Sequence, residues 1–178
     1  MILSNTEQLF LKKVTIDDIE TIRQWRNNPK ISQFMNFRDE ITKEMQLKWY
    51  QSIDNINNYY FMIIKNNVKI GLTEVKKINY KTFTAEAGIF IFEDKFLNAT
   101  IPYESILLLM NFAFENLMIK QLNIQVLESN KRAIRFNKSL GYKPNIELGS
   151  NWYTLTKNDY IKSKKKIEHA INISKGKQ

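Results

Sequence analysis

The chain has 178 residues, of which 43% are apolar, a size and composition that suit one globular domain with a proper hydrophobic core. It contains no cysteine and a single histidine. Disulfides and thiolate metal sites are therefore excluded, and little is left for a histidine metal site or a Ser-His triad. We expect chemistry that needs no metal.

The charge balance is strongly basic, with a net charge of +9 and a sequence pI of about 9.6, which favours polyanionic partners. Much of the excess lies in lysines after residue 160, so the simplest organisation is one domain at 1–160 and a basic tail at 161–178. On this interpretation nucleic acid is not expected as a partner, and a phosphate-bearing small molecule is favoured.

The N-terminal residues lack the basic region and long apolar core of a secretion signal. No apolar run approaches the ~20 residues that a membrane span needs. We therefore expect a cytoplasmic protein that is not associated with a membrane.

The first half of the chain predicts two helices among several strands. Thr15 caps the first helix and Pro29 ends it, and Thr42 opens the second. Asn66 and Asn67 tolerate the positive φ of a tight turn between two strands. The predicted strands of this half are 8–14, Tyr59–Lys65, Val68–Asn79 and 82–92.

The second half predicts an apolar helix, a strand at 121–127, a second helix and a final hairpin with strands at 145–148 and Trp152–Thr156. Thr100 can cap the apolar helix, and Pro102 is tolerated in its first turn. The second helix follows a turn at Asn130 and stops at Gly141, and the chain after Tyr160 is expected to be helical or loose. Together the elements predict an α/β fold with a mixed, mostly antiparallel sheet of six to seven strands and helices on both faces.

The helix that begins near Thr100 points its N-terminus out of a loop. Its first backbone N–H groups have no intrahelical partner and lie at the positive end of the helix dipole, which suits a phosphate. An ordinary helix start is the competing interpretation.

The order of elements in the segment 96–142 is loop, apolar helix, strand, turn and helix, and it contains the pattern N-x-x-A-I-x-x-x-x-x-L-G-[FY]. The pattern is carried by Asn130, Ala133, Ile134, Leu140, Gly141 and Tyr142. This segment resembles the acetyl-CoA-binding half of the GNAT superfamily of N-acetyltransferases. The resemblance implies acetyl transfer to an amine with acetyl-CoA as the cosubstrate and no metal. Dimers are common in this fold, so a homodimer is compatible with it.

The resemblance also implies where acetyl-CoA binds. The residues assigned to it are Phe90, Ile91 and Phe92 at a strand end, the loop residues Leu97, Asn98, Ala99, Thr100 and Ile101, and Asn130 and Asn137. The strand end is expected to splay from the strand at 121–127 and to offer free backbone groups. Relatives usually carry glycines in the loop, whereas this loop has none.

The remaining chemistry is proton transfer. Candidate bases are Glu74, which lies mid-strand among apolar residues, and Glu128 at a strand end, whereas Glu86 is expected to face solvent or brace the sheet. A water chain is an equally compatible base. Many relatives carry a tyrosine acid where this chain has Asn137, which can donate a hydrogen bond but no proton, so water or another hydroxyl such as Tyr103 or Tyr153 would protonate the leaving thiolate.

The amine acceptor is suggested by the first half of the chain, where QWRNNP resembles a turn found in two branches of the superfamily. One branch acts on ribosomal protein N-termini and the other on nucleotide-linked amino sugars. The stretch from this turn to residue 79 most resembles the enzyme type of the pseudaminic-acid pathway, which acetylates the 4-amino group of a nucleotide-linked sugar. That resemblance assigns the anionic acceptor to Arg26, Met35, Gln46 and Trp49.

Two alternatives remain open. The acceptor could instead be a protein N-terminus or another small amine, although the chain offers no acidic cluster for a cationic substrate. A GNAT-fold module that has lost catalysis and binds RNA or a partner through its basic surface is the non-enzymatic alternative.

Overall fold

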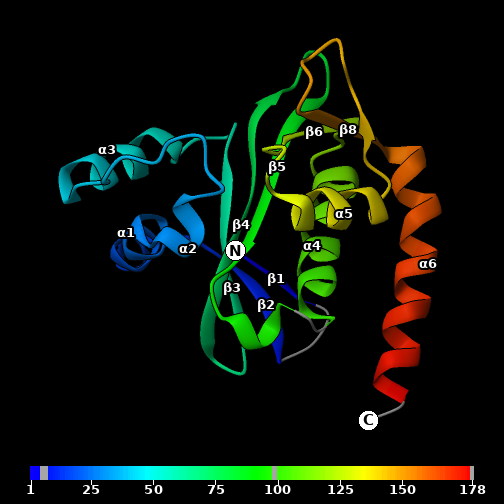
Figure 1. The fold of residues 1–178 in the computed structure, drawn as a ribbon, viewed down its shortest axis with the longest axis horizontal. Helices are drawn as coiled ribbons and strands as arrows, with labels where there is room; N and C mark the ends of the chain where they lie inside the picture. Colours follow the sequence, from blue (N-terminus) through cyan, green and yellow to red (C-terminus); the bar gives the residue numbers. More distant parts are fainter. Residues whose placement is uncertain (5–7, 98–99, 177–178) are drawn as a thin grey trace.

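The computed structural model describes residues 1–4, 8–97 and 100–176. Within these ranges the chain forms an eight-stranded sheet in the order β1-β2-β3-β4-β5-β6-β8-β7 (Figure 1). The strands are Ile2–Ser4 (β1), Leu9–Lys13 (β2), Tyr59–Lys65 (β3), Val68–Asn79 (β4), Thr84–Ile91 (β5), Gln121–Gln125 (β6), Lys143–Pro144 (β7) and Trp152–Thr156 (β8). Neighbouring strands are antiparallel except β5 and β6, which are parallel. The predicted α/β fold with a mixed, mostly antiparallel sheet is confirmed.

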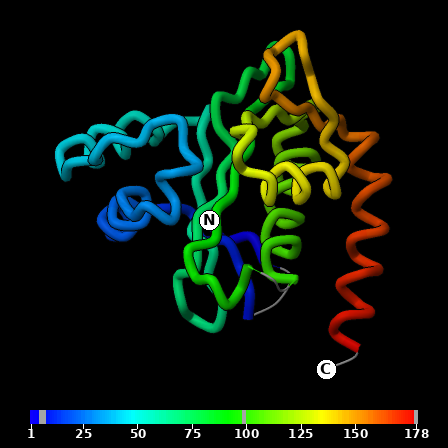
Figure 2. The backbone as a smooth tube through the Cα atoms, viewed as in Figure 1, coloured from blue at the N-terminus to red at the C-terminus, as the bar shows by residue number. Residues whose placement is uncertain are grey.

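Helices cover both faces of the sheet, with α1 to α3 on one side and α4 to α6 on the other (Figures 1 and 2). They are Ile19–Asn27 (α1), Pro29–Ser32 (α2), Lys43–Ile53 (α3), Ile101–Asn111 (α4), Lys131–Ser139 (α5) and Lys157–Gly176 (α6). Short 3-10 turns occur at Ile16–Asp18 and Asp94–Phe96, and a π-helical turn at Phe112–Asn116 extends α4. None of the helices in the described ranges is long and apolar enough to span a bilayer.

Strand β3 shows why helices must cover both faces of the sheet. Its side chains point alternately to the two faces, and four consecutive positions are buried. Phe61 and Ile63 belong to the larger core cluster under α4, while Met62 and Ile64 belong to a smaller cluster with Trp25 of α1. The sheet is therefore the wall between two cores.

The chain after residue 160 is helical as far as Gly176, and one face of that helix is buried. Tyr160 stacks on Phe114 with ring centroids 5.0 Å apart, and Ile167 and Ile171 are buried in the larger cluster. The inner face of α6 is therefore part of the core, and some of its lysines also bind the neighbouring helix, as Lys164 does to Asn111 and Lys175 to Glu104.

Three sequence predictions need correction. The sheet has one strand more than the upper estimate of seven, because β1 and the two-residue β7 are edge strands too short to give a pattern. Residues 146–148 form a turn, and β8 pairs with β7 on one side and with β6 on the other. The strand predicted at 82–92 is β5 and begins at Thr84, because the side chain of Asn79 accepts bonds from the backbone N–H groups of Lys81 and Thr82 and holds them in a turn.

Asp18 is a buried carboxylate that ties the start of α1 to the sheet. Lys69 of β4 lies 2.7 Å from one of its oxygens, and the N–H and hydroxyl of Thr15 donate to the other at 2.9 and 3.0 Å. Burial alone would raise the pKa of Asp18, but the bonds from Lys69 and Thr15 lower it below its usual value.

We expect Asp18→Asn to lower the free energy of unfolding at pH 7 by about 1–3 kcal/mol, because the charge-assisted bonds are lost. A carboxyl group whose pKa is lowered by folding contributes stability that is present above its unfolded pKa of about 3.9 and is lost as the pH falls through its folded pKa. Urea unfolding from pH 7 to pH 3 should therefore show a shallower acid loss in the variant. Parallel curves for the two proteins would contradict this role.

Candidate active site

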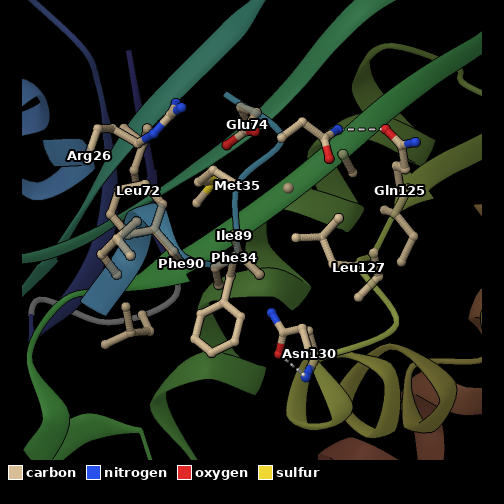
Figure 3. A pocket seen from close by; sticks show the side chains of 18 of the residues that line it. Arg26, Phe34, Met35, Leu72, Glu74, Ile89, Phe90, Gln125, Leu127 and Asn130 are labelled. Atoms are coloured by element: carbon tan, nitrogen blue, oxygen red, sulfur yellow. Dashed lines mark hydrogen bonds between the residues drawn. The ribbon is translucent and has the colours of Figure 1, made fainter. Parts of the chain in front are cut away.

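A cavity of about 1200 Å³ lies between the two halves of the molecule. We call its end beside α1 and α3 the α3 end, and its end beside α4 and α5 the α5 end. Figure 3 shows Arg26 and Glu74 away from Asn130, with Met35 and Ile89 between them. Ten of the residues predicted from the sequence line the cavity: Arg26, Met35, Gln46, Trp49, Glu74, Phe90, Ile91, Leu97, Asn130 and Asn137.

The other predicted residues are placed elsewhere. Asn98 and Ala99 lie outside the described residues. Phe92 stacks on Trp25 with ring centroids 5.3 Å apart, and Ile101 is buried in the larger core. Glu128 is exposed in the turn before α5 and is not among the cavity-lining residues. Their proposed roles remain predictions, and the placement favours Glu74 over Glu128.

The splay between β5 and β6 begins halfway along β5. The two strands pair only from Thr84 opposite Gln121 to Glu86 opposite Asn123. Beyond that point β5 continues to Ile91 and pairs with β4 alone, and residues 87–91 and 124–127 line the cavity. The structure therefore has the predicted opening between the strands.

The N-terminus of α4 borders the α5 end, but Thr100 does not cap it as predicted. Its hydroxyl donates to Glu104 at 2.6 Å and accepts nothing from the helix backbone. Pro102 lies in the first turn as predicted. The guanidinium group of Arg132 on α5 donates to the carbonyl of Leu97, which ties α5 to the start of the loop before α4.

The α3 end holds two buried donors without a partner. Among the described residues, neither Nε of Arg26 nor Nε2 of Gln46 has a hydrogen-bond partner. Trp49 packs edge-on against Tyr60 with ring centroids 5.1 Å apart. Burial and the neighbouring Glu74 raise the pKa of Tyr60 to about 12, so its hydroxyl stays neutral at physiological pH. This end is lined by aromatic rings and by donors that await an acceptor.

Glu74 faces the cavity because glycine lies opposite it. Glu74 of β4 is in register with Gly88 of β5, and a Cβ at Gly88 would lie 2.8 Å from the carboxyl carbon of Glu74. Lys76 lies 3.1 Å from the same carboxylate, and Glu74 raises the pKa of Lys76 above its usual range. The absence of a side chain at Gly88 leaves room for the carboxylate over β5, and the ion pair with Lys76 holds it there.

At the α5 end, Asn137 points one N–H donor at the carbonyl of Ala133, 2.9 Å away. Tyr103 also lines the cavity. The hydroxyl of Ser139 donates to the carbonyl of Phe136, so Tyr103 is the donor in its own 3.0 Å bond to Ser139. Tyr153, the other candidate hydroxyl, does not line the cavity.

A chain of side-chain hydrogen bonds in the cavity wall was not predicted from the sequence. The side-chain amide of Asn36 donates to Gln125 at 2.7 Å and joins the segment between α2 and α3 to the end of β6 (Figure 3). Gln125 in turn donates to Asn151 at 3.3 Å. No local pattern marks these amides, because the residues that meet are far apart in the sequence.

The charges around the cavity are mainly positive. Among the described residues, the lining carries three carboxylates, and each is paired with a lysine: Glu74 with Lys76, Glu86 with Lys77 and Asp94 with Lys30. Glu86 was expected to face solvent or brace the sheet, and its bond to Lys77 does join β5 to β4, although the residue also lines the cavity. Arg26, Arg132 and Arg135 add further positive charge to the lining. A cavity of this kind favours an anionic ligand.

A cavity that enters a splayed sheet on one side and reaches a wall of helices on the other suits a transferase that brings two substrates together. The sequence matches the family described as "Acetyltransferase (GNAT) domain" over residues 8–143. The chain belongs to this GNAT family. It is an acetyltransferase, and domains of this family use acetyl-CoA as the cosubstrate.

Named relatives are distant. An uncharacterised protein of Methanocaldococcus jannaschii is 28% identical over 144 residues, which are 79% of this chain and only 29% of that longer protein. The acetyltransferase PseH of Campylobacter jejuni is 26% identical over 148 residues, which are 82% of this chain and 90% of PseH. The solved structure of FdhC, described as a nucleotide-linked sugar GNAT, is similar in fold with a TM-score of 0.75 at 23% identity, covering 92% of this chain and 94% of FdhC.

Proposed function

We propose that this protein transfers the acetyl group of acetyl-CoA to the amine of a nucleotide-linked amino sugar, at the 4-amino group. The observation that carries the proposal is the pair of buried donors at the α3 end, Nε of Arg26 and Nε2 of Gln46, which have no partner among the described residues. The description of FdhC as a nucleotide-linked sugar GNAT agrees with this acceptor class.

The physical argument is that buried donors need acceptors. A buried N–H group without a partner costs about 1–3 kcal/mol, and a ligand that supplies an oxygen removes this cost. The diphosphate and hydroxyl oxygens of a nucleotide-linked sugar are such acceptors, and a guanidinium group binds phosphate especially well.

A cationic acceptor fits the cavity less well. Polyamines and peptide N-termini need free carboxylates, and each of the three carboxylates in the lining is already paired with a lysine. The excess of positive charge in the lining would repel a second cation. The charge pattern therefore supports an anionic acceptor over the alternative of a polyamine or protein N-terminus.

Acetyl-CoA fits the α5 end. The backbone groups of 87–91 that lack a β6 partner would hold the pantetheine arm, and the first turn of α4 would hold the pyrophosphate. Asn130 already caps α5 by accepting from Ala133 at 3.0 Å, so it fixes the adjoining wall. The acetyl-CoA thioester supplies the acyl group and a thiolate leaving group.

Two side chains of the cavity wall would take part in the reaction, one as a proton acceptor and one as a hydrogen-bond donor. Glu74 faces the cavity and can take the proton that the acceptor nitrogen loses. Asn137 lies in the opposite wall and keeps one of its two N–H donors for a ligand.

The acceptor class is tested with Arg26→Ala in a thiol-release assay against nucleotide-linked amino sugars, N-terminal peptides and polyamines. We expect turnover with the nucleotide-linked sugar, and in the variant a KM for that sugar about 10- to 100-fold higher with an unchanged KM for acetyl-CoA, because an Arg–phosphate contact is lost.

Lys48→Ala is the matched control, since Lys48 is an exposed cation on α3 that does not line the cavity. It should leave both KM values unchanged. Faster turnover of a polyamine or a peptide than of any nucleotide-linked sugar would contradict the proposal, as would equal effects of the two variants.

A further inference from the structure

The segment between α2 and α3 reaches across the cavity from the α3 end. We call residues 33–40 the strap; its first half, from Gln33 to Phe37, lines the cavity, and it consists of turns and bends without a helix or strand. Phe34 and Phe37 are 40% and 45% exposed although both line the cavity. A ligand that lies against the strap would therefore cover apolar surface, which favours a closed strap over a bound ligand.

Both ends of the strap are fixed on the side of α1. Before it, the side chain of Asn28 accepts a bond from the N–H of Lys30 at 3.0 Å and caps α2. After it, the side-chain amide of Asn27 bonds to both backbone groups of Ile41, at 2.9 Å each, and Arg23 donates to the same carbonyl at 3.0 Å. Because Asn27 and Asn28 are adjacent, the strap is a loop whose two ends lie together, and its middle can move while the ends stay in place.

The tip of the strap is hydrogen-bonded to the sheet. The side-chain amide of Asn36 donates to Gln125 at 2.7 Å, a bond that we call the latch, and Gln125 donates to Asn151 at 3.3 Å (Figure 3). Gln125 is the last residue of β6 and lies beyond Asn123, where the pairing of β5 with β6 stops. The latch therefore joins the strap to the far side of the opening between the splayed strands.

The latch is the attachment of the strap that breaks most readily. Asn36 and Gln125 are both exposed, so water can replace either partner, and a neutral hydrogen bond of this kind adds little net stability. The bonds between Asn27 and Ile41 are double and partly buried. Opening of the strap would therefore break the latch and leave both ends attached.

We propose that the strap is a gate for the acceptor: the latch opens to admit the acceptor and to release the acetylated product, and it closes to hold Met35 against the bound acceptor. The inference rests on the proposed function, which assigns the acceptor to the α3 end and acetyl-CoA to the α5 end. Met35 lies between these ends, where the acceptor amine and the thioester must meet (Figure 3). Closure covers the rings of Phe34 and Phe37 and excludes water from the reacting groups.

The first test locks the latch. The chain has no cysteine, so the double variant Asn36→Cys with Gln125→Cys carries two thiols and no others. Dibromobimane bridges two nearby thiols through stable thioethers and would tie the strap to β6. We expect the bridged protein to bind acetyl-CoA as before in calorimetry, but to acetylate the acceptor at least about 50-fold more slowly than the unbridged protein, because the acceptor cannot pass the strap.

The matched controls are the single variants Asn36→Cys and Gln125→Cys treated with monobromobimane, which adds the same group without a bridge, and they should stay active. Transfer is followed by the loss of thioester absorbance, because a thiol reagent would also react with the engineered cysteines. A bridged protein within about threefold of the unbridged rate would overturn the inference. So would an equal loss in either labelled single variant, or a double variant that does not form the bridge.

The second test needs no acceptor. Asn36→Ala removes the latch, and Asp39→Ala is its control on the same strap, since Asp39 is exposed, does not line the cavity and, within the described part of the chain, has a carboxylate without a hydrogen bond or ion pair. Hydrogen–deuterium exchange of the peptide that covers the strap should be about fivefold faster in Asn36→Ala, the factor expected for one lost hydrogen bond, and unchanged in Asp39→Ala. Equal exchange in wild type and Asn36→Ala would show that the latch does not hold the strap.

Failure of the gate and failure of the proposed function give different results. If no nucleotide-linked sugar reacts, the proposed function is wrong, and the bridging experiment is run with the acceptor that reacts fastest. If a nucleotide-linked sugar is the best acceptor and the bridged protein acetylates it at the unbridged rate, the acceptor class holds and the gate is overturned.

Discussion

Replacing Glu74 with glutamine should lower kcat by about 10²- to 10⁴-fold, with little change in the KM for acetyl-CoA. This is the range expected when a general base is lost, because glutamine has nearly the same shape but cannot accept the proton of the acceptor amine. The carboxylate lies in the cavity wall, held by Lys76 at 3.1 Å and by the space over Gly88. The measurement is steady-state thiol release with the best acceptor of the panel, together with circular dichroism to confirm the fold.

Glu128→Gln serves as the rival variant, because the sequence makes both carboxylates candidates. Glu128 is exposed in a turn and is not among the cavity-lining residues, so we expect it to keep nearly full activity. A large loss in Glu128→Gln with normal activity in Glu74→Gln would reverse the assignment. Normal activity in both variants would identify a water-relayed base.

The sequence predicts most elements of the fold because their signals are local. The strands β3 and β4 have the predicted bounds, and Asn66 and Asn67 adopt positive φ in the turn between them. Thr42 accepts a bond from the N–H of Met45 and opens α3 as expected. The edge strands β1 and β7 have only three and two residues, and their pairing depends on neighbours that a local pattern does not contain.

The site is less predictable, because its geometry depends on residues distant in the sequence. The proposed acetyl-CoA side of the cavity is predicted from one continuous segment that contains a motif. Whether Glu74 faces the cavity depends instead on the register that places Gly88 opposite it. The unpaired donors of Arg26 and Gln46 are visible only when every neighbouring acceptor is placed.

Two glycines on neighbouring strands should respond to alanine in opposite ways. A Cβ at Gly71 would overlap the backbone carbonyl oxygen of Phe90 and lie 3.0 Å from the Cα of Ile91. Because backbone atoms in the middle of a sheet cannot move aside, Gly71→Ala should lower the free energy of unfolding by about 3 kcal/mol. A Cβ at Gly88 would instead overlap the Glu74 carboxylate, which is the end of a flexible side chain.

Gly88→Ala should therefore keep most of its stability and lose activity, because the carboxylate must leave its place over β5. A displacement of about 1 Å at a reacting group can lower kcat by about 100-fold, so we expect a loss of that order with a nearly unchanged urea midpoint. The double variant Gly88→Ala with Glu74→Gln should then be no slower than Glu74→Gln alone, since both changes remove the same proton acceptor. A further loss in the double variant would mean that Gly88 serves another purpose, such as close approach of the acyl donor to β5. An active Gly88→Ala protein would show that the position of Glu74 does not limit the reaction.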